Sequence, residues 1–248
     1  MYKPVHNFAK GVSIYFTDAS DGSVAAGAGN PATPENIVNS KQFFTRHGLV
    51  YKNRTSFFGT YTPENTYTDI VRADDSLKNK RFTTDAVFTT DPHHPLTLTV
   101  ADCVATVVYD PVAGMLGVLH LGRHGSVAGL IEEFTVRVAD ELGSDPHDWH
   151  VWMSPSLQKE SNIMDYFEPP QPEEWEQWQY RDTEGILHID IPGHNRARFE
   201  RAGVKPENIY VSPIDTYTDR RYFSHRAATE GGQPSRQGRM MVVATIAV

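Results

Sequence analysis

The sequence predicts a mixed α/β fold, organised as one domain over residues 1–248. Short apolar stretches rich in β-branched residues, typical of strands, alternate along the chain with stretches whose apolar residues recur at helical spacing. No internal repeat and no low-complexity linker divides the chain, and 248 residues are enough to bury one large core. Hydrophobic residues make up 39% and charged residues 22%, a composition typical of folded rather than disordered proteins.

The first part of the chain reads as one helix among several short strands. Residues 11–16 alternate between apolar and polar side chains, as a half-buried strand does. After a glycine-rich loop, a Thr-Pro-Glu sequence is typical of a helix start and Gly48 of a helix end, so we expect a helix over residues 35–48. Aromatic and β-branched content predicts the next strands at residues 54–62, 68–74 and 83–90.

The longest β-branched stretch lies near the middle of the chain. We expect residues 95–110 to form one central strand and residues 115–122 to form the next, joined by the turn-forming sequence Asp-Pro-Val-Ala-Gly. Residues 126–143 repeat apolar side chains at helical spacing and end at Gly143, which predicts a helix.

The C-terminal part continues the alternation of strands and helices. Residues 148–157 have the composition of a strand, and residues 169–180 begin with prolines and carry three aromatic side chains, which we interpret as a helix. Residues 186–204 predict a strand followed by a helix. Three closing strands are expected in ENIYVSPI, YFSHRAAT and GRMMVVATIAV.

The charge balance and the cysteine content exclude several classes of protein. A formal net charge of -8 argues against a broad basic face for nucleic acid. A single cysteine leaves no internal disulfide and no zinc site built from several thiolates. No apolar run reaches the ~20 residues that cross a bilayer, and the N-terminus lacks the layout of a signal peptide. We therefore expect a cytoplasmic protein whose partner is a small molecule rather than nucleic acid or a membrane; its oligomeric state stays open.

The one cysteine of the chain, Cys103, lies in an apolar stretch and is followed by His120 at the end of the next one. A thiolate is a good nucleophile and a good soft metal ligand once its pKa is lowered, and a histidine can supply that help. Two adjacent strands joined by a short turn would let the two side chains meet. A cysteine in an apolar strand is also typical of a packing residue, so both interpretations stand at this point.

The turn that follows His120 has the features of an anion site. Gly122 and Gly125 allow a turn that leads into a helix from about Ser126, and backbone N–H groups at a helix start favour phosphate. Arg123 and His124 would add positive charge at the same place. Glycine spacing of this kind is common in turns, and the motif has little specificity by itself.

The stretches TTDAVFTTDP and LTVADCVATVVYDPVAGMLGVLHLGRHGSVAG, together with RYFSHR and QGRMMVV near the C-terminus, resemble the laccase-domain family. This family is also called YfiH-like, or the multicopper polyphenol oxidase family. The resemblance covers roughly residues 10–248, and it is specific because several motifs occur in combination. It implies a single-domain α/β/β/α layered fold.

The resemblance also implies an activity and a site. Family members are zinc-dependent enzymes that phosphorolyse purine nucleosides and deaminate adenosine, which makes zinc the expected metal and copper a less expected one. Cys103 and His120 match two of the zinc ligands, and Asp102 would orient a ligand or move a proton. Arg226 and Arg239 match family positions near the site, where Arg226 would bind substrate or phosphate.

Two departures from the family pattern concern the metal. Thr66 stands where the third ligand, a histidine, is expected, and Arg123 and His124 replace the family's tryptophan and arginine. Side chains that could replace the missing ligand are Glu64, Asp102, His124, His93 and His94.

Three functions therefore stay open. The first is a zinc-dependent purine nucleoside phosphorylase with a phosphate site around residues 122–126. The second is a metal-free hydrolase in which Cys103 is the nucleophile and His120 its base. His124 is a further candidate catalytic residue of the site. The third is a catalytically degenerate protein that still binds a nucleoside.

Overall fold

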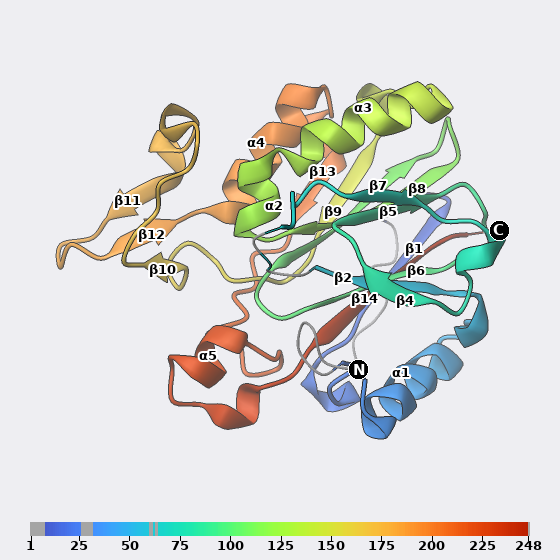
Figure 1. The fold of residues 1–248 in the computed structure, drawn as a ribbon, viewed down its shortest axis with the longest axis horizontal. Coiled ribbons are helices and arrows are strands. Elements are labelled where there is room, and N and C mark those ends of the chain that lie inside the picture. The colour runs from blue at the N-terminus through green and yellow to red at the C-terminus, as the bar shows by residue number, and fades with distance from the viewer. Residues whose placement is uncertain (1–7, 26–31, 60–61, 63, 248) are drawn as a thin grey trace.

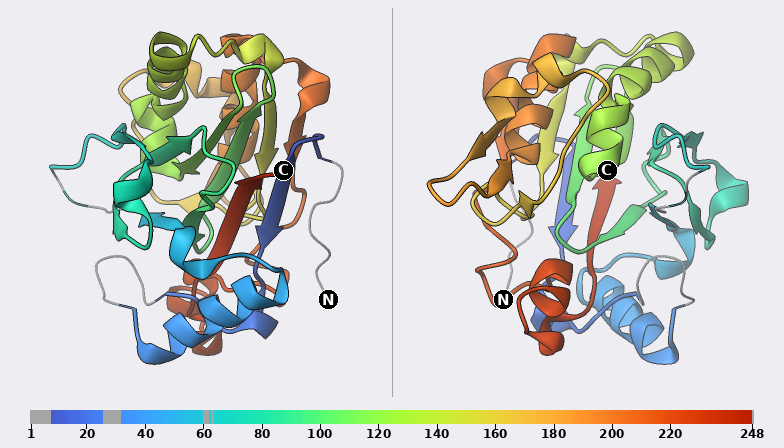
Figure 2. Two further views of the ribbon diagram at one scale, coloured as in Figure 1. Left: turned by 90° about the vertical axis from the view of Figure 1, so that its right-hand side faces the viewer. Right: turned by 60° about the vertical axis from the view of Figure 1, so that its left-hand side comes forward.

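Two large β-sheets pack face to face, and helices cover the outer face of each (Figures 1 and 2). The computed structural model describes residues 8–25, 32–59, 62 and 64–247. The mixed α/β class and the α/β/β/α layering expected from the family resemblance are confirmed.

The five-stranded sheet has the order β1-β14-β6-β2-β4. Its first three strands pair antiparallel, while β2 runs parallel to both β6 and β4. The strands are β1 (Val12–Phe16), β14 (Met240–Ile246), β6 (Leu96–Val100), β2 (Thr55–Phe58) and β4 (Arg81–Thr83).

The six-stranded sheet has the order β13-β9-β7-β8-β5-β3. Its four central strands pair antiparallel, and the two edge strands run parallel to their neighbours. The strands are β13 (Ile209–Val211), β9 (His150–Met153), β7 (Val104–Asp110), β8 (Met115–Leu121), β5 (Ala86–Thr89) and β3 (Ile70–Arg72).

A buried apolar layer between the two sheets forms the central core. Successive residues of a strand point to opposite faces, so each strand contributes every second residue to this layer. On β7 these are Ala105, Val107 and Tyr109, and on β8 they are Leu116 and Val118. Leu96, Leu98, Phe57 and Val242 of the other sheet face them.

The helices close the two outer faces. On the six-stranded sheet lie α2 (Arg123–Ala128), α3 (Leu130–Leu142) and α4 (Ile191–Ala202). On the five-stranded sheet lies α1 (Pro34–Arg46), capped by Thr33 and packed through Phe43 and Phe44. The helix expected over 126–143 begins earlier, at Arg123, and breaks at Gly129, whose φ is 82°.

A third, small sheet projects from the body of the molecule (Figure 1). It consists of β10 (Ile163–Met164), β12 (Leu187–Ile189) and β11 (Gln179–Arg181). The α-helix predicted over 169–180 is wrong, because that segment forms two 3-10 turns and then β11. Trp175 is 2% exposed and stacks on His194, with 3.7 Å between ring centroids, so tertiary packing holds this segment in its irregular path.

The strand predicted in YFSHRAAT is also wrong. Ser224 caps a short helix, α5 (His225–Thr229), by accepting a hydrogen bond from the Ala227 backbone N–H. Serine is a strong helix N-cap, which the strand interpretation overlooked.

The predicted central strand over 95–110 is in fact two strands in different sheets. β6 ends at Val100 in the five-stranded sheet, and β7 begins at Val104 in the six-stranded one. Asp102 lies between them with a φ of 76°, in a region where few residues other than glycine, asparagine and aspartate occur. The chain therefore crosses from one sheet to the other beside Cys103.

Short 3-10 helices occupy several of the connections. They span Ala19–Asp21, Tyr51–Asn53, Asp75–Leu77, Pro146–Asp148, Pro172–Glu174, Glu176–Trp178, Pro206–Asn208 and Pro234–Arg236. Within the described residues, none of the helices has the length and apolar character needed to span a membrane.

Candidate functional site

A cavity of about 480 Å³ lies where the inter-sheet core reaches the break between β6 and β7. Asp102, Cys103 and His120 all line it. Its other described walls are Ala25, Phe58, Gly59, Arg81, Thr99, Val100, Ala101, Leu157, His225, Arg226, Glu230 and Arg239. The sequence-predicted pair of Cys103 and His120 is thus brought to one cavity.

Strand register explains why these two side chains meet. In the β7–β8 pair, Ala105 lies opposite His120. Cys103 comes two residues before Ala105, and residues two apart along an extended chain share a face. Cys103 and His120 therefore both point toward the inter-sheet layer, as diagonal neighbours at its end.

His120 is buried, with 9% of its surface exposed. Its backbone N–H donates to the carbonyl oxygen of Asp85 at 2.8 Å. Burial lowers the pKa of His120 to about 4, and the nearby charge of Asp85 opposes this shift only in part. The imidazole is consequently neutral at pH 7, so one ring nitrogen is a hydrogen-bond donor and the other an acceptor.

Gly59 is a site residue that the sequence analysis missed. A Cβ atom built on Gly59 would overlap with the Nδ1 atom of His120. The residue at this position must therefore be glycine for the ring to keep its place. A glycine at the end of a strand can mark a bulge, a bend or a close approach, so the sequence held no specific signal for this contact.

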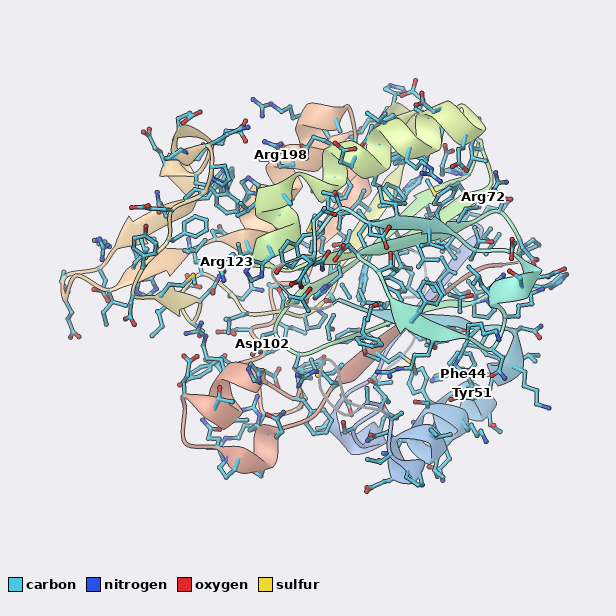
Figure 3. All side chains as sticks on the ribbon, viewed as in Figure 1. Phe44, Tyr51, Arg72, Asp102, Arg123 and Arg198 are labelled. Atoms are coloured by element: carbon cyan, nitrogen blue, oxygen red, sulfur yellow. The ribbon has the colours of Figure 1, made fainter. Side chains whose placement is uncertain are left out.

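Asp102 acts as a connector between segments that are distant in the chain. Its Oδ1 accepts a hydrogen bond from the Thr216 hydroxyl at 2.7 Å, and its Oδ2 accepts one from the Arg226 backbone N–H at 2.8 Å. Its carbonyl oxygen accepts from the Leu157 N–H at 2.9 Å. Figure 3 shows Asp102 between the body of the protein and α5. These bonds fix the wall of the cavity and hold α5 against it.

The basic turn after β8 lies outside the described cavity walls. The Arg123 Nη2 atom is 3.0 Å from the His124 Nε2 atom, and the His124 ring stacks on Tyr67 with 4.7 Å between centroids. Burial and the charge of Arg123 lower the pKa of His124. Arg123 is the first residue of α2 (Figure 3). Arg123 and His124 thus contact each other, and His124 contacts Tyr67 of the 64–69 loop.

Gly125 and Ser126 have structural contacts within the same turn. A Cβ atom on Gly125 would lie 2.9 Å from the His120 carbonyl oxygen, so α2 packs closely on the end of β8. The Ser126 hydroxyl donates to the Gly122 carbonyl oxygen at 2.9 Å. Neither residue lines the cavity, and a phosphate site on them stays a prediction.

Three arginines line the cavity, and the sequence analysis named two of them. Arg226 pairs with Glu230 at 2.9 Å. The Arg239 Nη1 atom donates to the Gly238 carbonyl oxygen at 2.8 Å. Arg81 lies over the Phe58 ring, 4.2 Å from its centroid. The sequence analysis missed Arg81 because it did not predict the three-residue strand β4.

Two of these guanidinium groups have no carboxylate counter-charge within the described residues. Neither Arg81 nor Arg239 forms an ion pair there. Guanidinium groups match phosphate and carboxylate oxygens in geometry and in charge. The arrangement favours an anionic ligand beside Cys103 and His120.

The described donors do not fit the zinc site that the family resemblance implies. In the part of the chain that the structure describes, no three His, Cys, Asp or Glu side chains are arranged to hold a metal ion. Cys103 and His120 supply two donors to the cavity, and both carboxylate oxygens of Asp102 accept protein hydrogen bonds. A catalytic zinc site uses three protein ligands.

The other side chains considered as a third ligand lie elsewhere. His94 is buried at the far end of β6, with its Nε2 atom 2.6 Å from the Thr55 hydroxyl, and His93 precedes it on the surface. Glu64 and Thr66 are both exposed. None of the four is among the described walls of the cavity.

Comparison with known proteins shows to which family the chain is similar. The model of the family described as multi-copper polyphenol oxidoreductase laccase matches residues 32–247. A purine nucleoside phosphorylase of Deinococcus radiodurans is 32% identical over 157 residues, which is 61% of this chain and 58% of that protein. A purine nucleoside phosphorylase of Staphylococcus aureus is 28% identical over 240 residues, covering 87% of this chain and 88% of that protein.

Solved structures show the same fold. The crystal structure of YlmD from Geobacillus stearothermophilus superposes with a TM-score of 0.81 at 18% identity, over 98% of this chain and 94% of that one. The chain spans somewhat over half the length of the Deinococcus relative, 58%. Since the family match runs from residue 32 to residue 247, the chain belongs to the multi-copper polyphenol oxidoreductase laccase family.

Proposed function

We propose that this chain is an enzyme that binds a purine nucleoside and phosphate in the 480 Å³ cavity and cleaves the nucleoside by phosphorolysis. The observation that carries the proposal is the meeting of Cys103 and His120 with the guanidinium groups of Arg81 and Arg239 in that cavity. The names of the Deinococcus and Staphylococcus relatives support the choice of substrate.

The arginines would bind and orient the phosphate. In phosphorolysis a phosphate oxygen forms a bond to C1′ of the ribose while the bond from C1′ to the purine nitrogen breaks. The electron pair of that bond passes to the purine, which takes a proton from water. Guanidinium groups without a carboxylate partner hold the phosphate against C1′ and reduce the loss of entropy in bringing the two reactants together.

His120 would contact the purine. Its neutral ring can donate one hydrogen bond and accept another, and the burial of His120 strengthens both. A donor N–H that points at the purine stabilises the charge that develops as the glycosidic bond breaks. Cys103 beside it would form part of the same surface. We assign no step to zinc, because the described residues supply two of the three ligands that such a site needs.

Hypoxanthine release from inosine tests the proposal. Release should require inorganic phosphate and should fall at least a hundredfold in His120→Ala, by about 2.7 kcal/mol of transition-state stabilisation. His147→Ala is a matched control. The His147 side chain is exposed and lies in the 3-10 helix before β9, and it is not among the described walls of the cavity. Full activity in His120→Ala, or release that is independent of phosphate, would contradict the proposal; ammonia release from adenosine tests the deaminase activity in the same samples.

A second candidate function, a metal-free Cys–His hydrolase, is favoured by one observation. Cys103 and His120 share a face, and a neutral imidazole is the form that accepts a proton from a nucleophile. Rapid alkylation of Cys103 by iodoacetamide at neutral pH would support this function. Alkylation no faster than that of a free thiol would count against it. A protein without turnover whose melting temperature still rises with inosine would be the degenerate binding protein.

A further inference from the structure

A second cavity, of about 350 Å³, lies between α1 and the outer face of the five-stranded sheet. Arg54, Ser56 and Thr97 line it, and Arg81 and Thr99 line both this cavity and the one that holds Cys103 and His120. Figure 3 shows Tyr51, another of its walls, near α1. The two cavities therefore meet at Arg81.

Strand register makes them one continuous surface. Arg54, Ser56 and Phe58 are two residues apart on and before β2, so they share one face of the sheet. Arg54 and Ser56 line the second cavity, whereas Phe58 lines the first. Ser56 pairs with Arg81 on β4 and with Thr97 on β6. From Arg54 to Phe58 the surface extends for about 13 Å.

Arg54 is a buried charged residue, which is unusual for an arginine without an acidic partner. It is 9% exposed, and the hydrogen bonds of its Nη1 atom go to uncharged oxygens, the Tyr51 carbonyl at 2.8 Å and the Asn79 Oδ1 atom at 3.0 Å. Its guanidinium lies 3.5 Å from the centroid of the Tyr51 ring. Burial lowers the pKa of Arg54, and the charge of Arg81 adds to that effect. Arginine nevertheless remains protonated, so two positive charges line this cavity.

Within the described residues, no carboxylate lies at ion-pair distance from Arg54 or Arg81. None of the described walls of the second cavity is Asp or Glu. Lys41 adds a third cation to those walls. A buried charge without a counter-charge destabilises a protein, and an anionic ligand relieves that cost.

We propose that Arg54 and Arg81 bind the phosphate group of a ligand in this second cavity. Two guanidinium groups on one face match the tetrahedral, doubly charged phosphate. The hydroxyls of Ser56 and Thr97, which are 2.7 Å apart, supply further polar contacts on the same face. The assignment does not involve Cys103 or His120; it shares Arg81 with the reaction proposed for them, whereas Arg54 lines the second cavity alone.

The phosphate can come from two sources. One is inorganic phosphate, and the other is a phosphate ester whose remaining part lies in the first cavity. For the second source the continuous surface favours a nucleoside 5′-monophosphate, with its purine toward His120; this identity of the ester rests on the proposed function. Arg81 at the junction would contact either ligand.

Calorimetric titration distinguishes these cases. Inorganic phosphate, inosine and inosine 5′-monophosphate are titrated into the wild-type protein and into Arg54→Gln, Arg81→Gln, Arg239→Gln and the surface control Arg137→Gln, whose side chain is exposed. We expect Arg54→Gln and Arg81→Gln each to weaken binding of the phosphate-bearing probe about tenfold or more. Inosine affinity should change less than twofold in Arg54→Gln, and Arg137→Gln should bind all three probes as the wild type does. Arg81→Gln provides a second test in case Arg54→Gln fails to fold. Its fold should persist, because Arg81 donates no side-chain hydrogen bond within the described residues.

Each outcome either identifies the ligand of the second cavity or overturns the proposal. Tighter binding of the nucleotide than of inosine, lost in Arg54→Gln, assigns the pocket to a phosphate ester. Arg54-dependent binding of inorganic phosphate, with no preference for the nucleotide, assigns it to free phosphate. Unchanged affinity for the phosphate-bearing probe in either Arg54→Gln or Arg81→Gln, or a loss in Arg239→Gln without one in Arg54→Gln, would overturn the proposal. Binding is measured without turnover, so this result is independent of the phosphorolysis assay.

Discussion

Cys103 and His120 lie on the same face of the β7–β8 pair, because His120 pairs with Ala105 and Cys103 precedes Ala105 by two residues. The pair closes the inter-sheet core at the point where the chain passes from one sheet to the other.

The contact between Gly59 and His120 is tested by Gly59→Ala. The added methyl group would overlap with the Nδ1 atom, so the imidazole must move from its place in the cavity. We expect phosphorolysis to fall about tenfold or more, because small displacements of a catalytic group are costly. The protein should still fold, since Gly59 does not have a positive φ, but moving a buried ring should lower the free energy of unfolding by about 1–3 kcal/mol. Unchanged turnover in a folded Gly59→Ala would show that the ring position is unimportant.

The connecting role of Asp102 is tested by comparing Asp102→Asn with Asp102→Ala. Asparagine tolerates the positive φ and keeps one of the two side-chain hydrogen bonds, whereas alanine loses both and is strained at that φ. Each hydrogen bond to the carboxylate is worth about 1.5–3 kcal/mol. Urea unfolding should therefore rank the stabilities as wild type, then Asp102→Asn, then Asp102→Ala. Equal stability of the three proteins would contradict this role.

The pH dependence of stability is set in part by His194. It is 2% exposed, and burial lowers its pKa to about 4. In the unfolded state His194 has a pKa near 6.5, so the unfolded chain binds the proton more readily than the folded protein does. The free energy of unfolding is therefore unaffected by protonation of His194 above pH 6.5 and falls as the pH decreases toward 4. The loss amounts to about 3 kcal/mol.

His194→Phe should reduce that dependence. Phenylalanine can keep the stack on Trp175 but does not titrate. Urea unfolding at pH 7, 5.5 and 4.5 should show a shallower decline for His194→Phe than for the wild type. Part of the decline should persist, because the pKa of His120 is lowered in the same way. An identical decline in both proteins would contradict the assignment to His194.

Metal binding is tested by the zinc content of the wild type and of Thr66→His. We expect the purified wild-type protein to hold less than one zinc ion per chain, since Cys103 and His120 are two donors where three are needed. Thr66→His places an imidazole where the family resemblance puts a ligand, but residue 66 is exposed and is not among the described walls of the cavity, so zinc content by elemental analysis should stay at the wild-type level. Zinc near one per chain in Thr66→His, lost again on adding Cys103→Ser, would contradict this placement. Stoichiometric zinc in the wild type would show that another group supplies the third ligand.

Several elements are determined by local sequence. The β7–β8 hairpin follows from two apolar strands joined by a short turn, and α1 from its Thr33 cap with proline at the first turn. The proximity of Cys103 to His120 could be predicted from the sequence for the same reason. A hairpin brings its two strands together without contacts to distant parts of the chain.

The tertiary structure decided the rest. Residues 95–110 are β-branched throughout, yet the strand breaks at Asp102, whose unusual φ depends on Thr216 and Arg226 more than a hundred residues away. The meeting of Arg54 with Arg81 likewise comes from the pairing of β2 with β4. Sequence by itself determined the local periodicity, the caps and the turn, since these depend on neighbouring residues. Which charges gather around Cys103 and His120 was decided by strand order and register, which arise only when distant segments pack together.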